Sequence, residues 1–209
     1  MQNAKKISEK VPPIKDLEGR FHFIGNDTLR QNVALEFQYI IFLIAVLDEA
    51  GAEGSSIASS THKDMITHTA CVVEACTHYA LSEYIRAGKV VSHEVMPKEE
   101  KYVDPKLLYK ISSDERLMLV REVKRVEKLH PKTQLKSLNE AALASGIYDQ
   151  DMFAKAEALR ILRNKMHLPG LDAVDSSYDE TVSNRAFELA KIILNRIEEK
   201  LQEVASADQ

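Results

Sequence analysis

Apolar residues recur at the spacing of an α-helix over most of this chain. The first long segment begins at Asp27, which we expect to be its N-cap, and ends at Gly51, a residue suited to a helix C-cap. A second segment keeps the same spacing from Thr61 to Ala87 and stops at Gly88. Because both segments are long and rich in apolar side chains, we expect two largely buried helices.

The C-terminal half of the chain carries the same helical spacing. We expect a short helix over 133–146 with Gly146 as its cap. A long helix is predicted over 149–168, because Pro169 and Gly170 must terminate it.

A final amphipathic helix is predicted over 176–205. Ser177 and Glu180 have the spacing of a capping box at its start. Six apolar residues then recur at helical spacing: Ala186, Leu189, Ile193, Ile197, Leu201 and Val204.

Two segments lack this pattern. Residues 1–27 are polar and include Pro12-Pro13, so we expect a flexible, irregular N-terminal arm. Residues 91–131 combine prolines, charge and alternating apolar positions, which indicates an insertion with a small hairpin. The pattern as a whole predicts an all-α, up-and-down helical bundle formed by one domain over 28–206.

Composition and charge indicate which kind of protein this is. The chain has 209 residues and a net charge of -4, so no global basic field marks it as a nucleic-acid binder. The first residues lack the apolar core of a signal peptide. The longest apolar run of the chain, Tyr39 to Leu47, is too short to cross a bilayer, so we expect a cytoplasmic protein without a membrane anchor. Cys71 and Cys76 lie in one predicted helix, where we expect inert, buried packing residues rather than a disulfide.

A polar cluster interrupts the predicted helix over 149–168, in the stretch ALRILRNKMHLPG. Its members are Arg160, Arg163, Asn164 and His167. At about 100° per residue these four share one face of the helix, beside an apolar stripe that we expect to face the core. The stripe consists of Met152, Ala156, Leu159, Leu162 and Met166. His167 lies in the last turn, where we expect it to titrate near neutral pH.

The LRNKMH sequence in this setting resembles the HEPN domain (higher eukaryotes and prokaryotes nucleotide-binding). The resemblance covers roughly 28–87 and 134–205 and implies a four- or five-helix bundle, commonly dimeric. Many members are metal-independent endoribonucleases in toxin, phage-defence and RNA-processing systems. The family signature is an Arg with a polar follower, then four to six residues and a His.

This chain matches that signature in two ways. Arg163-Asn164 gives the polar follower but leaves only three residues before His167. Arg160 leaves six residues before His167, but Ile161 follows it. The sequence leaves open which arginine would act.

RNA cleavage through the 2′-hydroxyl requires a proton acceptor and cations beside the phosphate. His167 fits the first role, Arg160 or Arg163 the second, and Asn164 could orient either group. Glu74, on the second predicted helix, is a candidate partner for one of the arginines. The alternative is structural: Arg163 and Asn164 tie down the helix end and His167 satisfies a carbonyl.

Two functions follow from the resemblance. One is a homodimeric, metal-independent endoribonuclease acting on RNA, with LRNKMH at or beside the dimer interface. A partner protein such as an antitoxin would fit this function. The other is a non-catalytic HEPN-like module for dimerisation or for binding a ligand or RNA. No cofactor or metal is expected: the chain lacks a glycine-rich phosphate loop, and His68, Cys71 and His78 are too spread along one helix to bind zinc.

Overall fold

The computed structural model describes residues 2–51, 54–96, 98–126, 129–164 and 178–207. Its three longest helices are α3 (Asp27–Ala50), α4 (Ser56–Arg86) and α8 (Glu180–Ala207). The shorter helices are α1 (Gln2–Lys10), α2 (Ile14–Glu18), the 3-10 helix η1 (Gly19–Phe21), α5 (Ser92–Val95), α6 (Leu135–Ala144) and α7 (Gln150–Asn164). One hairpin consists of β1 (Lys98–Lys110) and β2 (Arg116–Val126). The predicted all-α class with a hairpin insertion is confirmed.

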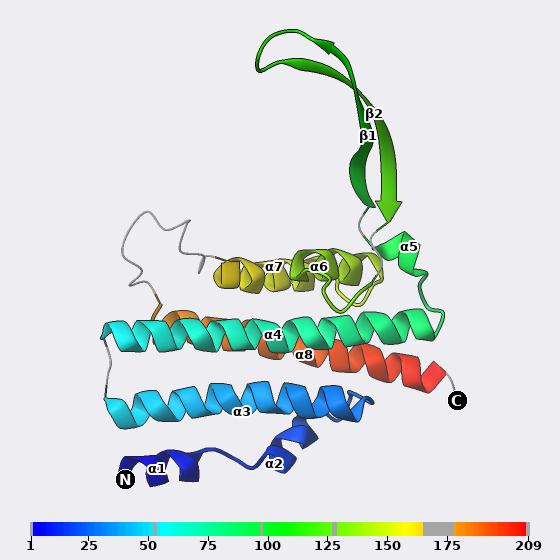
Figure 1. Ribbon diagram of the computed structural model, residues 1–209. Coiled ribbons are helices and arrows are strands. Elements are labelled where there is room, and N and C mark those ends of the chain that lie inside the picture. The colour runs from blue at the N-terminus through cyan, green and yellow to red at the C-terminus, as the bar shows by residue number, and fades with distance from the viewer. Residues whose placement is uncertain (1, 52–53, 97, 127–128, 165–177, 208–209) are drawn as a thin grey trace.

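Helix α4 lies at the centre of the bundle and packs against α3, α6, α7 and α8. In Figure 1, α6 and α7 cover one side of α4, and α3 lies on the opposite side with α1 and α2 along its outer face. The colour gradient shows that α3, α4, α7 and α8 alternate in direction along the chain (Figure 1). This is the up-and-down arrangement that the sequence predicts.

Helix α3 begins one residue away from the predicted cap position. The N-cap is Asn26, whose Oδ1 accepts a hydrogen bond from the backbone N–H of Leu29 at 2.9 Å. Asp27 instead lies inside the first turn, where its Oδ1 lies 2.6 Å from Nη2 of Arg30 and forms an ion pair with it. The predicted C-cap is confirmed, because Gly51 adopts a left-handed conformation with φ of 56°.

Helix α4 begins earlier than the sequence predicted. The start at Thr61 is wrong, because the helix runs from Ser56 and Ser55 caps it by accepting from the N–H of Ala58 at 3.1 Å. The stretch GAEGSSIASS is rich in Gly and Ser, a composition typical of loops. Buried Ala58 shows instead that the first turn packs on the bundle.

The N-terminal segment is packed, so the prediction of a flexible, irregular arm over 1–27 is wrong. Leu17, Phe21 and Ile24 are buried in the main core. Phe21 packs edge-to-face on Phe37 of α3, with ring centroids 5.8 Å apart. A few well-spaced apolar residues therefore anchor a segment whose overall composition is polar.

The C-terminal helices largely follow the prediction. Gly146 ends the short helix with φ of 76°. Helix α7 is described as far as Asn164, so the predicted stop at Pro169 and Gly170 lies outside the described residues. Ser177 of the predicted capping box also lies outside them. The six apolar positions predicted for α8 are buried or pack against the core, namely Ala186, Leu189, Ile193, Ile197, Leu201 and Val204.

The hairpin stands away from the bundle (Figure 1). β1 and β2 pair antiparallel, with register shifts between Val103 and Lys106 and between Leu107 and Tyr109. The predicted hairpin is therefore confirmed, and its strands have 13 and 11 residues. Among the described residues, no helix has the length and apolarity needed to cross a membrane.

Candidate functional site

The apolar stripe of α7 faces the core and thereby fixes where its polar face points. Ala156 and Leu159 are buried, and Met152 and Leu162 pack against the core from the sides. Met166, the last predicted member of the stripe, lies outside the described residues. Arg160 and Arg163 are consequently held on one partly exposed face, as the helical spacing predicted.

Arg163 reaches from α7 to α4, where it pairs with Glu74. Its Nη1 donates to Oε2 of Glu74 at 2.8 Å. The predicted contact between Glu74 and one of the two arginines is therefore present, and Arg163 is the partner. The side chains keep exposed fractions of 32% and 27%, so the pair lies at the protein surface rather than in the core. A guanidinium has five N–H donors, so this contact leaves others available.

Arg160 belongs to a separate network with Glu157 and Asn139. Its Nε and Nη2 both lie 2.8 Å from Oε2 of Glu157, one turn earlier on α7. The other oxygen of Glu157 accepts from Nδ2 of Asn139, a fully buried residue of α6, at 2.8 Å. Burial alone would raise the pKa of Glu157, but the hydrogen bonds from Arg160 and Asn139 outweigh it and lower that pKa below 4.5.

The remaining two members of the polar cluster lie at the end of α7. Asn164 is the last residue of the helix and is exposed. His167 lies outside the described residues. The structure thus brings Arg163 and Glu74 together and places Arg160 and Asn164 on the same helix.

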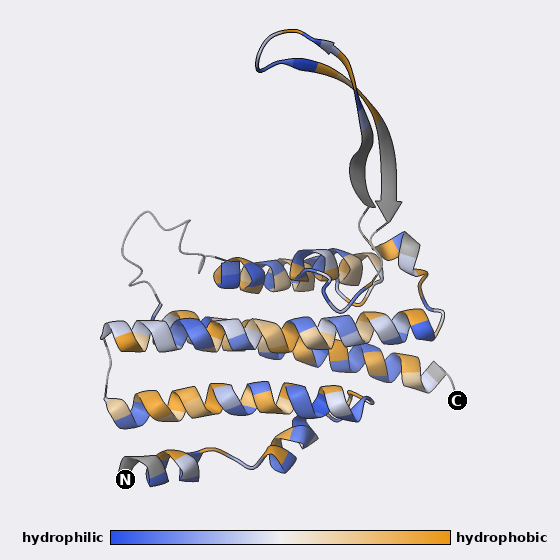
Figure 2. Cartoon of the chain, viewed as in Figure 1, coloured by the Kyte–Doolittle hydropathy of each residue, from blue (hydrophilic) through white to orange (hydrophobic). Residues whose placement is uncertain are grey.

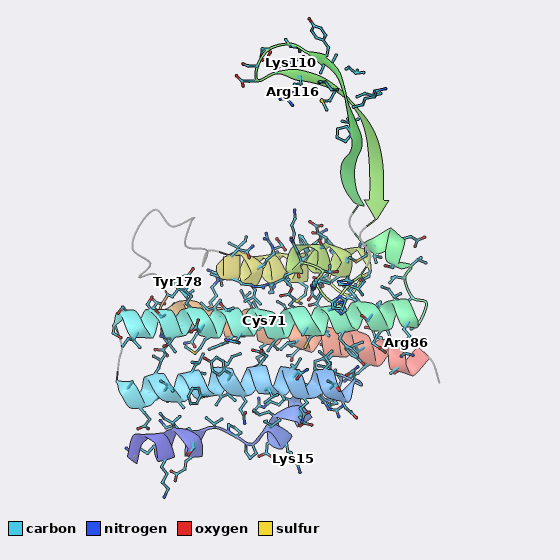
Figure 3. All side chains as sticks on the ribbon, viewed as in Figure 1. Lys15, Cys71, Arg86, Lys110, Arg116 and Tyr178 are labelled. Atoms are coloured by element: carbon cyan, nitrogen blue, oxygen red, sulfur yellow. The ribbon has the colours of Figure 1, made fainter. Side chains whose placement is uncertain are left out.

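A cleft of about 930 Å³ runs along α4 beside Glu74. Cys71, Glu74 and His78 lie along one side of the helix and contribute to the wall. Gly25, Asn26, Pro131 and Thr133 close the cleft from segments distant in the sequence. In the stick view, Cys71 lies midway along α4 and Arg86 near its C-terminal end (Figure 3).

The two cysteines differ in their surroundings. Cys76 is fully buried, and burial raises its pKa to about 12, which confirms the prediction of an inert packing residue. Cys71 is only half-buried and lines the cleft, so the prediction that both thiols are buried is wrong for this residue. Burial still raises the pKa of Cys71 above 9.0 against the opposing charge of Arg163, so its thiol stays protonated at neutral pH.

No group of metal-binding side chains is found in the part of the chain that the structure describes. His68 is engaged elsewhere, because its Nδ1 lies 2.5 Å from Oε2 of Glu36 on α3. His78 lines the cleft, and burial lowers its pKa below 6.5 despite the nearby charge of Glu74. A neutral imidazole therefore faces the cleft at physiological pH.

Sequence reasoning missed three of these features: Glu157, Asn139 and the cleft. The spacing of Glu157 and Arg160, three apart on a helix, was a usable signal. Asn139 gave no signal in the sequence, because its position opposite Glu157 depends on how α6 packs against α7. The cleft depends on three distant segments meeting, which no local pattern encodes.

Comparisons with known proteins give no relative from which a function could be transferred. No family model matches this chain, and no curated protein or solved structure shows a significant match. The site must therefore be interpreted from its own residues.

Proposed function

We propose that this protein is a homodimeric, HEPN-like endoribonuclease that cleaves RNA without a metal ion, with the polar face of α7 as its site. The observation that carries the proposal is the contact between Arg163 and Glu74. It holds a guanidinium on α7 in one orientation, at the surface, with N–H donors left over. Donors fixed before the reaction stabilise developing charge without paying for reorganisation.

Arg160 supports the same proposal from one turn earlier. Glu157 holds its Nε and Nη2, and Asn139 in turn holds Glu157. Two cations on one helix face, each anchored by a carboxylate, can contact the non-bridging oxygens of a phosphodiester. Exposed Asn164 adds an amide at the same end of the helix.

The reaction proposed here uses the RNA's own nucleophile. His167 takes the proton from the 2′-hydroxyl, and the 2′-oxygen forms a bond to phosphorus. The bond from phosphorus to the 5′-oxygen breaks, and that oxygen leaves with a proton from water. The products are a 2′,3′-cyclic phosphate and a 5′-hydroxyl, and the arginines stabilise the charge on phosphorus between them.

Cleavage of a mixed RNA pool in EDTA tests this proposal. The variants are His167→Ala, Arg163→Ala and Arg160→Ala, with Arg185→Ala on α8 and His22→Ala near the N-terminus as matched controls. Both control side chains are well exposed, so neither substitution should disturb the core. We expect the parent and the controls to cleave RNA, and His167→Ala and Arg163→Ala to be at least about a hundredfold slower. His167→Ala should melt like the parent, whereas Arg163→Ala should also lose about 1 kcal/mol of stability with its contact to Glu74.

One observation favours a second candidate, a non-catalytic HEPN-like binding module. Each arginine of the cluster faces a carboxylate, so the two pairs together carry little net positive charge. On this alternative the pairs stabilise the contacts of α7 with α4 and α6. On this alternative the parent would cleave no RNA, and His167→Ala would also melt earlier than the parent, by an amount worth about 1 kcal/mol.

A further inference from the structure

The tip of the hairpin, residues 105–120, carries an unusual concentration of exposed apolar side chains. Of the sixteen large apolar side chains that are exposed in the described part of the chain, eight lie here. They are Leu107, Leu108, Tyr109, Ile111, Leu117, Met118, Leu119 and Val120. Figure 2 shows this end of the hairpin in alternating apolar and polar colours, far from the bundle. Exposed apolar patches of this kind mark interaction surfaces.

Both faces of the tip carry apolar side chains. Leu107 pairs with Met118 and Tyr109 pairs with Leu117, and side chains alternate between the faces along each strand. Leu117 and Leu119 therefore share one face, and Met118 and Val120 share the other. Because apolar side chains stand on both faces, a groove can cover more of them than a flat surface can.

The hairpin also lacks support of its own. Within the described residues, β1 and β2 form a two-stranded sheet, so each strand keeps one unpaired edge. An isolated two-stranded hairpin is marginally stable in water, and an open apolar edge promotes association. A tip with these properties requires a partner.

The same chain contains an apolar groove that could accept the tip. The groove has a volume of about 460 Å³ and is formed by η1, α3, α4 and α8. Partly exposed apolar side chains line it, among them Phe23, Phe37, Ile41, Ile44, Phe187 and Leu194. Ile44 is the most exposed of these.

Charge favours this match. Three charged side chains line the groove. Arg20 and Lys191 are exposed and pair with no carboxylate within the described residues, whereas Oε1 of Glu198 lies 3.3 Å from Nε2 of His22. The turn of the hairpin carries Asp114 and Glu115, both exposed and without a cationic partner in the same part of the chain. Lys110 and Arg116 flank this turn, as the labels in Figure 3 show. An acidic turn entering a groove with basic residues gives complementary charge across the contact.

The hairpin cannot reach this groove in its own chain. It projects from the side of the bundle covered by α6 and α7, whereas α3 lies on the opposite side of α4 (Figure 1). We propose that the hairpin tip docks in the apolar groove of a second copy of this chain, and that the exchange is reciprocal about a two-fold axis. This contact, rather than the polar face of α7, holds the dimer together, and it does not depend on RNA cleavage.

Sedimentation velocity on the full chain at micromolar concentration tests the proposal. The tip variant is Leu117→Lys with Leu119→Lys, and the groove variant is Ile44→Glu. Ile57→Lys and Ile57→Glu are the matched controls, because Ile57 is exposed at the start of α4 and belongs to neither surface. We expect the parent and controls to be dimers, and each variant to be a folded monomer that still unfolds cooperatively. A monomeric parent overturns the proposal.

Mixing the two variants distinguishes this exchange from other dimers. The tip variant keeps the parent's groove, and the groove variant keeps the parent's tip. An equimolar mixture should therefore form heterodimers, in which the unchanged tip of one chain docks in the unchanged groove of the other. If the hairpins instead paired with each other, or if α7 alone held the dimer, the groove variant would remain dimeric. That result overturns the inference and leaves the proposed ribonuclease untouched.

Charge reversal gives an independent check. Asp114→Lys with Glu115→Lys, and separately Arg20→Glu with Lys191→Glu, should each weaken dimerisation at least about tenfold. All four substitutions in one chain should recover most of that loss, because opposite charges face each other again. Failure of the combined variant to recover would contradict the assigned groove.

Discussion

Nη1 of Arg163 lies 2.8 Å from Oε2 of Glu74, across 89 positions of the sequence. The contact joins α7 to the central helix and fixes the rotation of the polar face of α7 relative to the cleft. On the proposed function it orients the guanidinium that contacts phosphate. On the structural alternative its only role is stability.

A double-mutant cycle measures the contribution of this pair to folding. Because both side chains are about two-thirds buried, we expect Arg163→Ala and Glu74→Ala each to lower the free energy of unfolding by about 1 kcal/mol. The double variant should lose less than the sum, with a coupling free energy of about 0.5–1 kcal/mol. Urea unfolding measures these free energies, with Arg185→Ala as the exposed control. If the two single effects simply add, the contact between Arg163 and Glu74 does not stabilise the fold.

The pH dependence of stability should reveal the lowered pKa of Glu157. A carboxyl group whose pKa is lower in the folded state adds stability above its unfolded pKa of about 4.5. That contribution disappears as the pH falls below 4.5 through the folded value. The free energies of unfolding of the parent and Glu157→Gln should therefore differ at pH 6 and become equal near pH 3. A constant difference across this range would contradict the network with Arg160 and Asn139.

The two thiols should react differently in the native protein. Cys76 should resist a thiol reagent until the chain unfolds, because it is fully buried and its pKa is raised to about 12. Cys71 should react, but more slowly than a free cysteine at pH 8, because its pKa is raised above 9.0. Single-cysteine variants Cys71→Ser and Cys76→Ser separate the signals, and rapid labelling of both sites at neutral pH would be incompatible with this account.

The N-terminal segment should contribute to the stability of the bundle. Phe21 is buried against Phe37, so Phe21→Ala should lower the free energy of unfolding by about 3 kcal/mol. The exposed Leu35 on α3 provides a control, since Leu35→Ala should change it by less than about 0.5 kcal/mol. Equal stability of Phe21→Ala and the parent would restore the original prediction of a flexible arm.

The sequence predicted those parts of the fold that depend on long-range periodicity. In α8 the apolar residues repeat from Ala186 to Val204, over about five turns, and Ile193 and Ile197 are accordingly fully buried. The contact of Glu74 with α7 could be predicted because both helices expose one polar face. The N-terminal segment could not, because three buried residues in a polar stretch give too few repeats to reveal a face.

The details of the site depended on tertiary packing. The sequence left open which arginine contacts Glu74, and the packing of α7 against α4 gave this partner to Arg163. Arg160 instead pairs with Glu157, one turn earlier on the same helix. Likewise, Cys71 and Cys76 looked alike, but five residues of helix turn them to different surroundings, one toward the cleft and one into the core.

The ribonuclease proposal is tested most directly by the chemistry of its products. An RNA found to be cleaved in the mixed pool is synthesised with a single 2′-deoxynucleotide at the cut and incubated with the parent protein in EDTA. We predict that the all-ribose RNA yields a 2′,3′-cyclic phosphate and a 5′-hydroxyl, and that the deoxy-substituted RNA is not cut at that position. Absence of cleavage of every RNA in EDTA, or cutting at the deoxy position, would contradict the mechanism.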